Sequence, residues 1–337
     1  MRVKRSPTIG DVAKRAGVSP TTVSLVLNDV GGSSVSGPTR ERVRRSIQDL
    51  GYRPNVAAKL LRESRSHTIG FVTDEIASTP FSGGIIEGAQ DAAWENGKIL
   101  MIVNTGRNRK MEERAAEMML ERRVESIIYA TMFHKAVEPP KGFREVPAIL
   151  LDCYSEGGDW PSVVPDEVSG GRAATEALLA KGHERIGFIN LPPGSPAAAG
   201  RLEGYGQALK ARGLVLNTDL VRYGDGRSSG GYMGALELML AAEPPTAIFC
   251  GNDPTAMGAY EALKELGLYI PQDVAVVGFD NQTLIADQLR PPLSTVALPH
   301  YEMGQWAVNY LIEHAGSGEP PPVQSTLDCA YIERESV

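Results

Sequence analysis

The sequence has few cysteines, few aromatic residues and no long apolar run, and each shortage excludes a class of protein. Its three cysteines, Cys153, Cys250 and Cys329, are odd in number and form no C-x-x-C pair. This pattern argues against a disulfide framework and a zinc finger, and it suits a reducing cytoplasm. No apolar run approaches the ~18 residues that span a membrane, and none follows the basic N-terminus. We therefore expect a cytoplasmic protein with no membrane contact.

The 337 residues are enough for two or three domains, and the charge is divided unevenly between them. Residues 1–66 contain 13 Lys and Arg against 5 Asp and Glu, a net charge of +8. The other 271 residues contain 21 against 36, a net charge of −15, which brings the chain to −7. Such asymmetry is typical of a small nucleic-acid-binding module joined to an acidic body. A basic solvated surface would give the same count, so the residue pattern must decide.

The start of the basic region predicts two short helices joined by a glycine turn. Thr8 and Asp11 form a capping-box pattern at the start of the first helix, and Gly17 ends it. Ser19 is the expected cap of the second helix, with Pro20 at the first position, where a missing N–H costs nothing. This arrangement is a helix-turn-helix, whose second helix enters the major groove of DNA.

A third helix is expected between a cap at Ser36 and a stop at Gly51. Its apolar stripe consists of Val43, Ile47 and Leu50. Any three-helix bundle would show such a stripe. A bundle does not require the arginines clustered at positions 40, 42, 44, 45 and 53, nor the net charge of +8. We therefore interpret residues 1–53 as an all-α DNA-binding domain.

The run Thr8-Ile-Gly-Asp-Val-Ala-Lys-Arg-Ala-Gly-Val-Ser-Pro-Thr-Thr-Val-Ser-Leu-Val-Leu-Asn28 resembles the N-terminal motif of the LacI/GalR family of bacterial repressors. Residues 35–43 and 50–55 continue the family's spacing, and the resemblance extends over essentially the whole chain. It implies a hinge helix and linker at 54–66 and an effector-binding and dimerisation domain at 67–337. The DNA contacts that it implies are Thr8, Ser19, Pro20, Thr21, Thr22, Ser24, Leu25, Asn28, Arg40, Tyr52, Asn55, Ala58 and Leu61.

Two of these leucines have separate implications. Leu25 stands where the family commonly has an arginine, which reads guanine, whereas leucine offers only apolar contact, for instance to a thymine methyl. The bound sequence is therefore less predictable than usual. Leu61 falls where the family inserts a leucine into the minor groove, and such a wedge kinks DNA. Without the resemblance, we would interpret residues 54–62 as a linker helix whose leucines pack on the body.

From Thr68 onward, strand and helix patterns alternate in two consecutive series. The first series has strands at 68–74, 98–103, 125–130 and 147–152 and helices at 81–96 and 111–122. The second has helices at 173–180, 202–211, 232–241 and 255–266 and strands at 185–191, 246–250 and 274–279. Two such series imply two α/β lobes with parallel sheets and a ligand cleft at the carboxyl ends of the strands.

This pattern resembles the two-lobed type I periplasmic-binding-protein fold that forms the effector domain of LacI/GalR proteins. Residues 166–187, 250–258, 276–280 and 291–296 carry the resemblance. We expect the N-terminal lobe at about 67–163 and 294–323 and the C-terminal lobe at about 164–293 and 324–337.

Polar residues at strand ends and helix starts are candidate effector contacts. Asp280 follows Val-Val-Gly-Phe, and Asn252 follows Ile-Phe-Cys-Gly. Arg201 is expected to begin a helix after a loose loop at 192–200, opposite the other two across the cleft. The family places effector contacts at these three positions, and together they donate and accept as the vicinal hydroxyls of a sugar require. The alternatives are a surface salt bridge for Arg201 and a helix cap for Asn252. Phe81 is expected against the ligand or in the core, and the weaker candidates are Asp152, Tyr154 and Tyr223.

Other motifs do not support an enzyme or a metal protein. The run Gly226-Arg-Ser-Ser-Gly230 matches G-x-S-x-G, but a nucleophile elbow needs a strand directly before it, and Tyr-Gly-Asp precedes it here. We predict a loop leading to a helix. The five histidines show no H-x-x-x-H spacing, and no Walker A motif occurs. We expect no metal and no cofactor.

The sequence therefore predicts a ligand-responsive repressor that binds a pseudo-palindromic operator as a homodimer, because one recognition helix specifies too few bases. A sugar is the expected effector, and a purine is the alternative within the same architecture. A transport-associated sugar-binding protein is the second hypothesis, which the helix-turn-helix and the missing signal peptide oppose. A hydrolase would rest on the elbow motif alone. Residues 329–337 contain no leucine-heptad helix, which favours a dimer over a tetramer.

Overall fold

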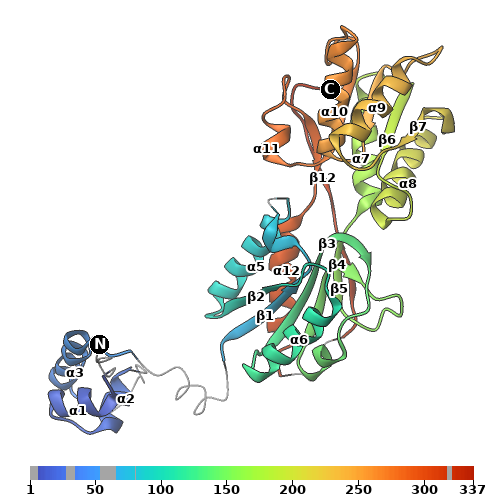
Figure 1. Cartoon of the computed structure of the whole chain (residues 1–337). Helices are drawn as coiled ribbons and strands as arrows, with labels where there is room; N and C mark the ends of the chain where they lie inside the picture. Colours follow the sequence, from blue (N-terminus) through green and yellow to red (C-terminus); the bar gives the residue numbers. More distant parts are fainter. Residues whose placement is uncertain (1–6, 28–34, 54–65, 80, 317–320) are drawn as a thin grey trace. The chain divides into compact units, whose positions relative to one another are not determined.

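The structure is a computed structural model that describes residues 7–27, 35–53, 66–79, 81–316 and 321–337. The chain divides into two compact units, Met1–Ser66 and His67–Val337. Figure 1 shows both units coloured along the sequence. Four predicted DNA contacts lie outside the described residues: Asn28, Asn55, Ala58 and Leu61. Most of the predicted hinge helix and linker lies outside them as well.

The first unit contains the three predicted helices: α1 (Ile9–Ala16), α2 (Pro20–Leu27) and α3 (Gly37–Leu50). The capping box is present, because the Thr8 N–H donates to Asp11 Oδ2 at 2.8 Å and the Asp11 N–H donates to Thr8 Oγ1 at 3.3 Å. Ser19 caps α2 through a 3.1 Å hydrogen bond from the Thr22 N–H. Local sequence signals therefore place the helix starts correctly.

A small apolar core joins these helices. Val12, Val23 and Val43 contribute one fully buried side chain from each helix. Gly17 and Gly51 end α1 and α3 in the left-handed conformation, at φ 65° and 61°. Glycine adopts this conformation without a Cβ penalty, so the predicted helix stops are confirmed.

The second unit contains two six-stranded sheets, one in each lobe (Figure 1). All neighbouring strands of the first sheet are parallel, in the order β11 (Gln324–Leu327), β5 (Ser162–Pro165), β4 (Ala148–Tyr154), β3 (Ser126–Ala136), β1 (Thr68–Thr73) and β2 (Ile99–Asn104). The second sheet has the order β12 (Ala330–Ile332), β10 (Ser294–Ala297), β9 (Ala275–Asp280), β8 (Ala247–Cys250), β6 (Ile186–Asn190) and β7 (Val221–Tyr223). Only β12 is antiparallel to its neighbour among these described strands.

Helices cover both faces of each sheet, so the central strands are buried throughout their length, as in β1 and β9. In the first lobe α5 packs against α12, and in the second lobe α7 packs against α8 and α9 against α10. The bounds are α5 (Gly83–Glu95), α6 (Arg109–Glu121), α7 (Glu167–Ala180), α8 (Pro196–Ala211), α9 (Ser228–Met239), α10 (Asp253–Glu265), α11 (Thr283–Ala286) and α12 (His300–Glu313). The described part of the chain also has the short 3₁₀ helices η1 (Ile76–Ser78), η2 (Lys141–Glu145) and η3 (Thr218–Leu220).

The sequence patterns predict most of the long elements and miss several short ones. Strands β5, β7, β10, β11 and β12 have three or four residues each, too few to show a periodicity. The helix α12 is also missed.

At three places in the described chain, the backbone passes from one lobe to the other. These places lie between β5 and α7, between β10 and α12, and between β11 and β12. The predicted lobe bounds are wrong by one strand at the second and third places and by two residues at the first. Ser294–Ala297 pairs with β9 in the second sheet, Gln324–Leu327 pairs with β5 in the first, and the boundary at 163 falls inside β5. Pairing between distant strands decides this assignment, and no local pattern reports it.

Candidate functional site

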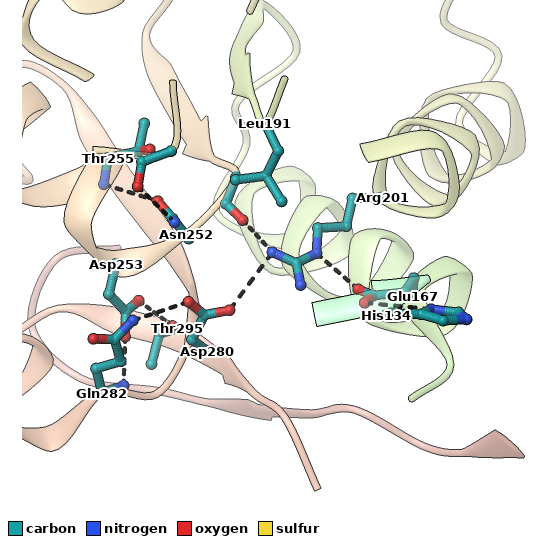
Figure 2. Close-up of polar contacts among 12 residues, drawn as sticks. His134, Glu167, Leu191, Arg201, Asn252, Asp253, Thr255, Asp280, Gln282 and Thr295 are labelled. Carbon is teal, nitrogen blue, oxygen red and sulfur yellow. Dashed lines mark hydrogen bonds and ion pairs between the residues drawn. The ribbon is translucent and has the colours of Figure 1, made fainter. Parts of the chain in front are cut away.

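Arg201 lies at the centre of a buried group of charged side chains (Figure 2). Its side chain is 4% exposed. Nε donates to Glu167 Oε2 at 2.7 Å, and Nη1 lies 3.6 Å from Asp280 Oδ1 and donates to the Gly251 carbonyl. Burial alone would lower the pKa of Arg201, but the two carboxylates raise it. Arg201 is therefore a buried, paired cation, and the surface salt bridge considered as its alternative is wrong.

The backbone of α8 fixes Arg201 in this place. The helix begins at Pro196 and is capped by Ser195, which accepts from the Ala198 N–H at 3.1 Å. The sequence predicts Arg201 at the start of this helix, but the structure places it in the second turn. The neighbouring helix approaches closely at Gly171, where a Cβ would lie 2.4 Å from the Arg201 carbonyl oxygen. Only glycine allows this contact.

Asp280 ends β9 with a φ of 107°, a conformation that side chains other than glycine rarely adopt. Gln282 Nε2 donates to its Oδ2 at 3.1 Å. Burial raises the pKa of Asp280 to about 7, against the opposing effects of Arg201 and Gln282. A strained backbone beside a buried carboxyl group is a common feature of binding sites.

Asp253 supports this end of the second sheet from the start of α10. Its carboxyl group is fully buried and accepts hydrogen bonds from Thr295 Oγ1 at 2.6 Å and from the Gln282 N–H at 2.7 Å. Burial, and then the nearby Asp280, raise the pKa of Asp253 well above its ordinary value. Asp253 has its hydrogen-bond partners within the protein, so it supports the site without facing a ligand.

Asn252 caps α10. Its Oδ1 accepts from the Thr255 N–H at 2.9 Å, and its Nδ2 donates to the Gly226 carbonyl at 2.9 Å. These bonds leave one N–H and one acceptor position on the amide for a ligand. The side chain can therefore be a helix cap and a ligand contact together.

The three main candidates share one lobe. Arg201 and Asn252 follow strands of the second sheet and Asp280 ends one, so the expectation that Arg201 faces the other two across the cleft is wrong. Tyr223, the last residue of β7, belongs to the same lobe and is 52% exposed.

The first lobe contributes two buried polar side chains at the carboxyl ends of β3 and β4. His134 Nδ1 lies 3.9 Å from Glu167 Oε1 across the lobe boundary and has no hydrogen bond among the described residues. Asp152 is 4% exposed, has a φ of 54°, and its Oδ1 likewise has no described partner. Burial, and then Glu167, raise the pKa of Asp152, and burial lowers the pKa of His134. Buried polar atoms of this kind are expected to receive a partner from elsewhere.

Phe81 and His300 form an edge-to-face ring pair at 5.2 Å in the first lobe. Phe81 is half-buried, which is compatible with both of its predicted roles. His300 is the first residue after the second passage between the lobes. Burial, and then the charge of Arg201, lower its pKa to about 4. The charge of Arg201 therefore affects the pKa of a group in the other lobe.

The first unit presents the start of α2 to solvent. Ser19, Pro20 and Thr21 are exposed, which is typical of a recognition helix. The other described contacts are half-buried: Thr8, Thr22, Ser24, Leu25, Arg40 and Tyr52. Thr8 is engaged in its capping box, and Arg40 Nε donates to the Val35 carbonyl at 3.3 Å.

The sequence reasoning missed Glu167, Asp253, His134 and His300. Glu167 and Asp253 are each the first residue of a helix that follows a strand, so a search for carboxylates at such positions would have found them. His134 lies on a strand without any motif and meets Glu167 only in the folded protein. No local signal marks it.

None of the described helices is long and apolar enough to cross a membrane, and no three His, Cys, Asp or Glu side chains of the described residues gather as metal ligands. Ser228 begins α9, and residues 224–227 separate it from β7. The predicted loop before a helix is therefore confirmed.

A helix-turn-helix joined to a two-lobed α/β unit with a buried polar cluster at the lobe junction defines the class of ligand-responsive DNA-binding regulators. Residues 8–55 match the family of bacterial regulatory proteins of the lacI type. Residues 66–335 match periplasmic binding proteins and the sugar binding domain of the LacI family. The chain belongs to the LacI family.

Relatives in this family match nearly the whole chain. The ribose operon repressor of Escherichia coli K12 is 34% identical over 307 residues, which are 90% of this chain and 92% of the repressor. The structure of a complex between the transcriptional regulator CelR and cellobiose has 31% identity, a TM-score of 0.69, and covers 98% of this chain and 100% of CelR. A Lac repressor dimer bound to its operator and an anti-inducer has 28% identity, a TM-score of 0.80, and covers 98% and 99%.

Proposed function

We propose that this protein is a transcriptional repressor that binds a pseudo-palindromic operator as a homodimer. Its DNA affinity changes when an uncharged sugar binds between the two lobes, and it acts in the bacterial cytoplasm without catalysing a reaction. The observation that carries this proposal is the presence, in one chain, of a helix-turn-helix whose second helix has an exposed start and of a buried donor and acceptor cluster at the lobe junction. The sugar complex of CelR supports the effector part of this proposal, and the operator complex of the Lac repressor dimer supports the DNA-binding part.

On the DNA side, the start of α2 enters the major groove and arginines of the first unit contact phosphates. The contacts assigned are Thr8, Ser19, Pro20, Thr21, Thr22, Ser24, Leu25, Asn28, Arg40, Tyr52, Asn55, Ala58 and Leu61. Leu61→Ala should weaken operator binding and reduce DNA bending while leaving sugar binding intact. Gel mobility of circularly permuted operators measures the bend, and an unchanged bend would remove Leu61 from the mechanism.

On the effector side, the second lobe offers Arg201, Asn252, Asp280 and Tyr223, and the first lobe offers Phe81 and Asp152. Hydroxyl groups of a sugar can donate to the Asp152 oxygen that lacks a described partner and to Asp280. They can accept from Arg201 and Asn252. A ligand that satisfies groups on both lobes favours the closed arrangement, and this difference in affinity couples it to DNA binding.

The experiment starts from the full chain. Selection from random DNA identifies the operator, and fluorescence anisotropy then follows its release by D-ribose, cellobiose and a purine base. We expect a sugar to change operator affinity by about 5- to 150-fold, the usual range of allosteric coupling. Release by the purine base alone would replace the sugar assignment. Failure to select any sequence would contradict the repressor assignment.

A parallel control addresses catalysis. Mass spectrometry of each sugar after incubation with the wild-type protein and with Ser228→Ala should show unchanged sugar in both cases. Turnover by the wild type that the variant loses would establish a hydrolase instead.

A further inference from the structure

Glu167 is a buried carboxylate shared by the two lobes. It is the first residue of α7, directly after the first passage between lobes, and its side chain is 5% exposed. Oε2 accepts from Arg201 Nε at 2.7 Å, while Oε1 lies 3.9 Å from His134 Nδ1 of the first lobe. Figure 2 shows the side chain between Arg201 and His134. Any ligand held by Arg201 therefore lies close to this carboxylate.

The charges around Arg201 leave no positive surplus. Glu167 and Asp280 flank the guanidinium at 2.7 and 3.6 Å. The imidazoles of His134 and His300 add no charge at neutral pH, because burial lowers the pKa of both. Lys135 follows His134 on β3, and its Nζ is paired with Asp74 Oδ2 at 2.9 Å. Among the described residues of the cluster, the cation is balanced or outnumbered.

The hydrogen bonds of Arg201 also favour an uncharged ligand. Nε donates to Glu167 and Nη1 donates to the Gly251 carbonyl, while Asp280 forms an ion pair with Nη1 at 3.6 Å. Among the described residues, Nη2 has no hydrogen-bond partner. A hydroxyl oxygen can accept from Nη2 without any balancing charge. A phosphate or carboxylate there would place further negative charge beside two buried carboxylates, where Coulomb repulsion is only weakly screened.

We propose that Glu167 sets the charge preference of the effector site, because it neutralises Arg201 and so admits uncharged polyols while excluding phosphorylated and carboxylated sugars. The proposal rests on the proposed function only in placing the effector at this cluster. It makes Glu167 a specificity-determining residue that acts through Arg201. The amide of Glu167→Gln keeps the shape and the acceptor for Nε but removes the charge.

The test compares Glu167→Gln with Glu176→Gln. Glu176 lies on the same helix, is 58% exposed and only approaches Arg172 at 3.9 Å, so its variant controls for a lost surface charge. Calorimetry at constant ionic strength measures the binding of inorganic phosphate, D-ribose and ribose 5-phosphate. We expect the wild type and Glu176→Gln to bind neither anion measurably. Glu167→Gln should bind phosphate and ribose 5-phosphate at least tenfold more tightly than the wild type, a change of about 1.4 kcal/mol.

The double variant Glu167→Gln with Arg201→Gln locates the gain. It removes both charges, so the anion affinity gained by Glu167→Gln should disappear. A gain that persists in the double variant would place the anion elsewhere and overturn the proposal. So would a folded Glu167→Gln protein that gains no anion affinity. If Glu167→Gln does not fold, tighter binding of ribose 5-phosphate than of D-ribose by the wild type overturns the proposal, and the reverse order supports it.

These outcomes separate the charge preference from the proposed function. Operator release by a phosphorylated sugar would preserve the repressor and overturn the role of Glu167. An operator that no small molecule releases would contradict the effector response, while the phosphate titrations of the two variants would still decide whether Glu167 excludes anions.

Discussion

The two units of this protein use charge in opposite ways. The first has a net charge of +8, and its arginines at positions 42, 44 and 45 are exposed on α3. The second has a net charge of −15, yet its central cation, Arg201, is 4% exposed and paired with carboxylates. Exposed charges act by their number and are screened by salt, whereas buried charges act by their position and are screened little. The comparison teaches that DNA attraction is a sum over many residues, while ligand recognition depends on a few contacts.

Salt should produce the largest difference between the units. If the first unit makes six or more phosphate contacts, operator affinity should fall by about 10³-fold or more between 50 and 200 mM salt. Sugar affinity should change by less than about twofold over the same range, because Arg201 and its partners are buried. Anisotropy and calorimetry on the same preparation measure both. Equal salt sensitivity of the two affinities would break the comparison.

Arg201→Ala should be the most damaging single change in the second unit. It leaves Glu167 and Asp280 buried without their counter-charge, which should lower the free energy of unfolding by about 3–5 kcal/mol. Where the variant folds, sugar affinity should also fall about ten- to a hundredfold. The matched control is Arg114→Ala, whose partner Glu117 lies 2.6 Å away at 63% exposure and whose loss should leave the free energy of unfolding almost unchanged. Urea unfolding of both variants measures this, and similar losses would show that burial does not matter.

Acid should weaken the second unit through His300. Its pKa is about 4 in the folded protein against 6.5 ordinarily, so the unfolded chain takes up the proton first. Stability is therefore lost as the pH falls from about 6.5 to about 4, by up to ~3 kcal/mol. His300→Gln should lack this loss in urea unfolding at several pH values.

Asp280 should change the stability with pH in the opposite direction to His300, so it serves as the control for that experiment. Its raised pKa of about 7 means that the folded protein holds the proton longer, so this group loses stability as the pH rises from about 4 to about 7. Asp280→Asn should remove the loss of stability that accompanies rising pH and should keep the loss that His300 causes as the pH falls. A pH profile that neither variant alters would contradict both assignments.

The smallest expected effect concerns the first unit. Thr8→Ala removes the cap of α1 and should destabilise this unit by about 1 kcal/mol, with a matching loss of operator affinity where the helix frays. Sugar affinity should stay unchanged. Thermal unfolding followed by circular dichroism measures the cap, and Thr8→Ser, which retains the hydroxyl group, should restore most of the loss.

The sequence by itself predicted the three described helices of the first unit, since its signals act over short distances. Thr8 and Asp11 are three positions apart, as are Ser19 and Thr22, and each pair forms the hydrogen bonds expected of a cap. The alternating helices and strands of the second unit were predictable for a similar reason, because each long element carries its own apolar period. The positions of Asp280 and Asn252 at strand ends followed from that alternation.

Only the tertiary structure decided which lobe each short strand joins and what surrounds Arg201. Ser162 Oγ donates to Gln324 Oε1 at 2.6 Å across 162 positions of sequence, and this pairing assigns β11 to the first sheet. Glu167 and Arg201 are 34 positions apart, and their contact requires the close packing of α7 on α8 at Gly171. A buried ion pair forms where two separately formed elements exclude water together, so its partners are set by packing and not by neighbouring residues.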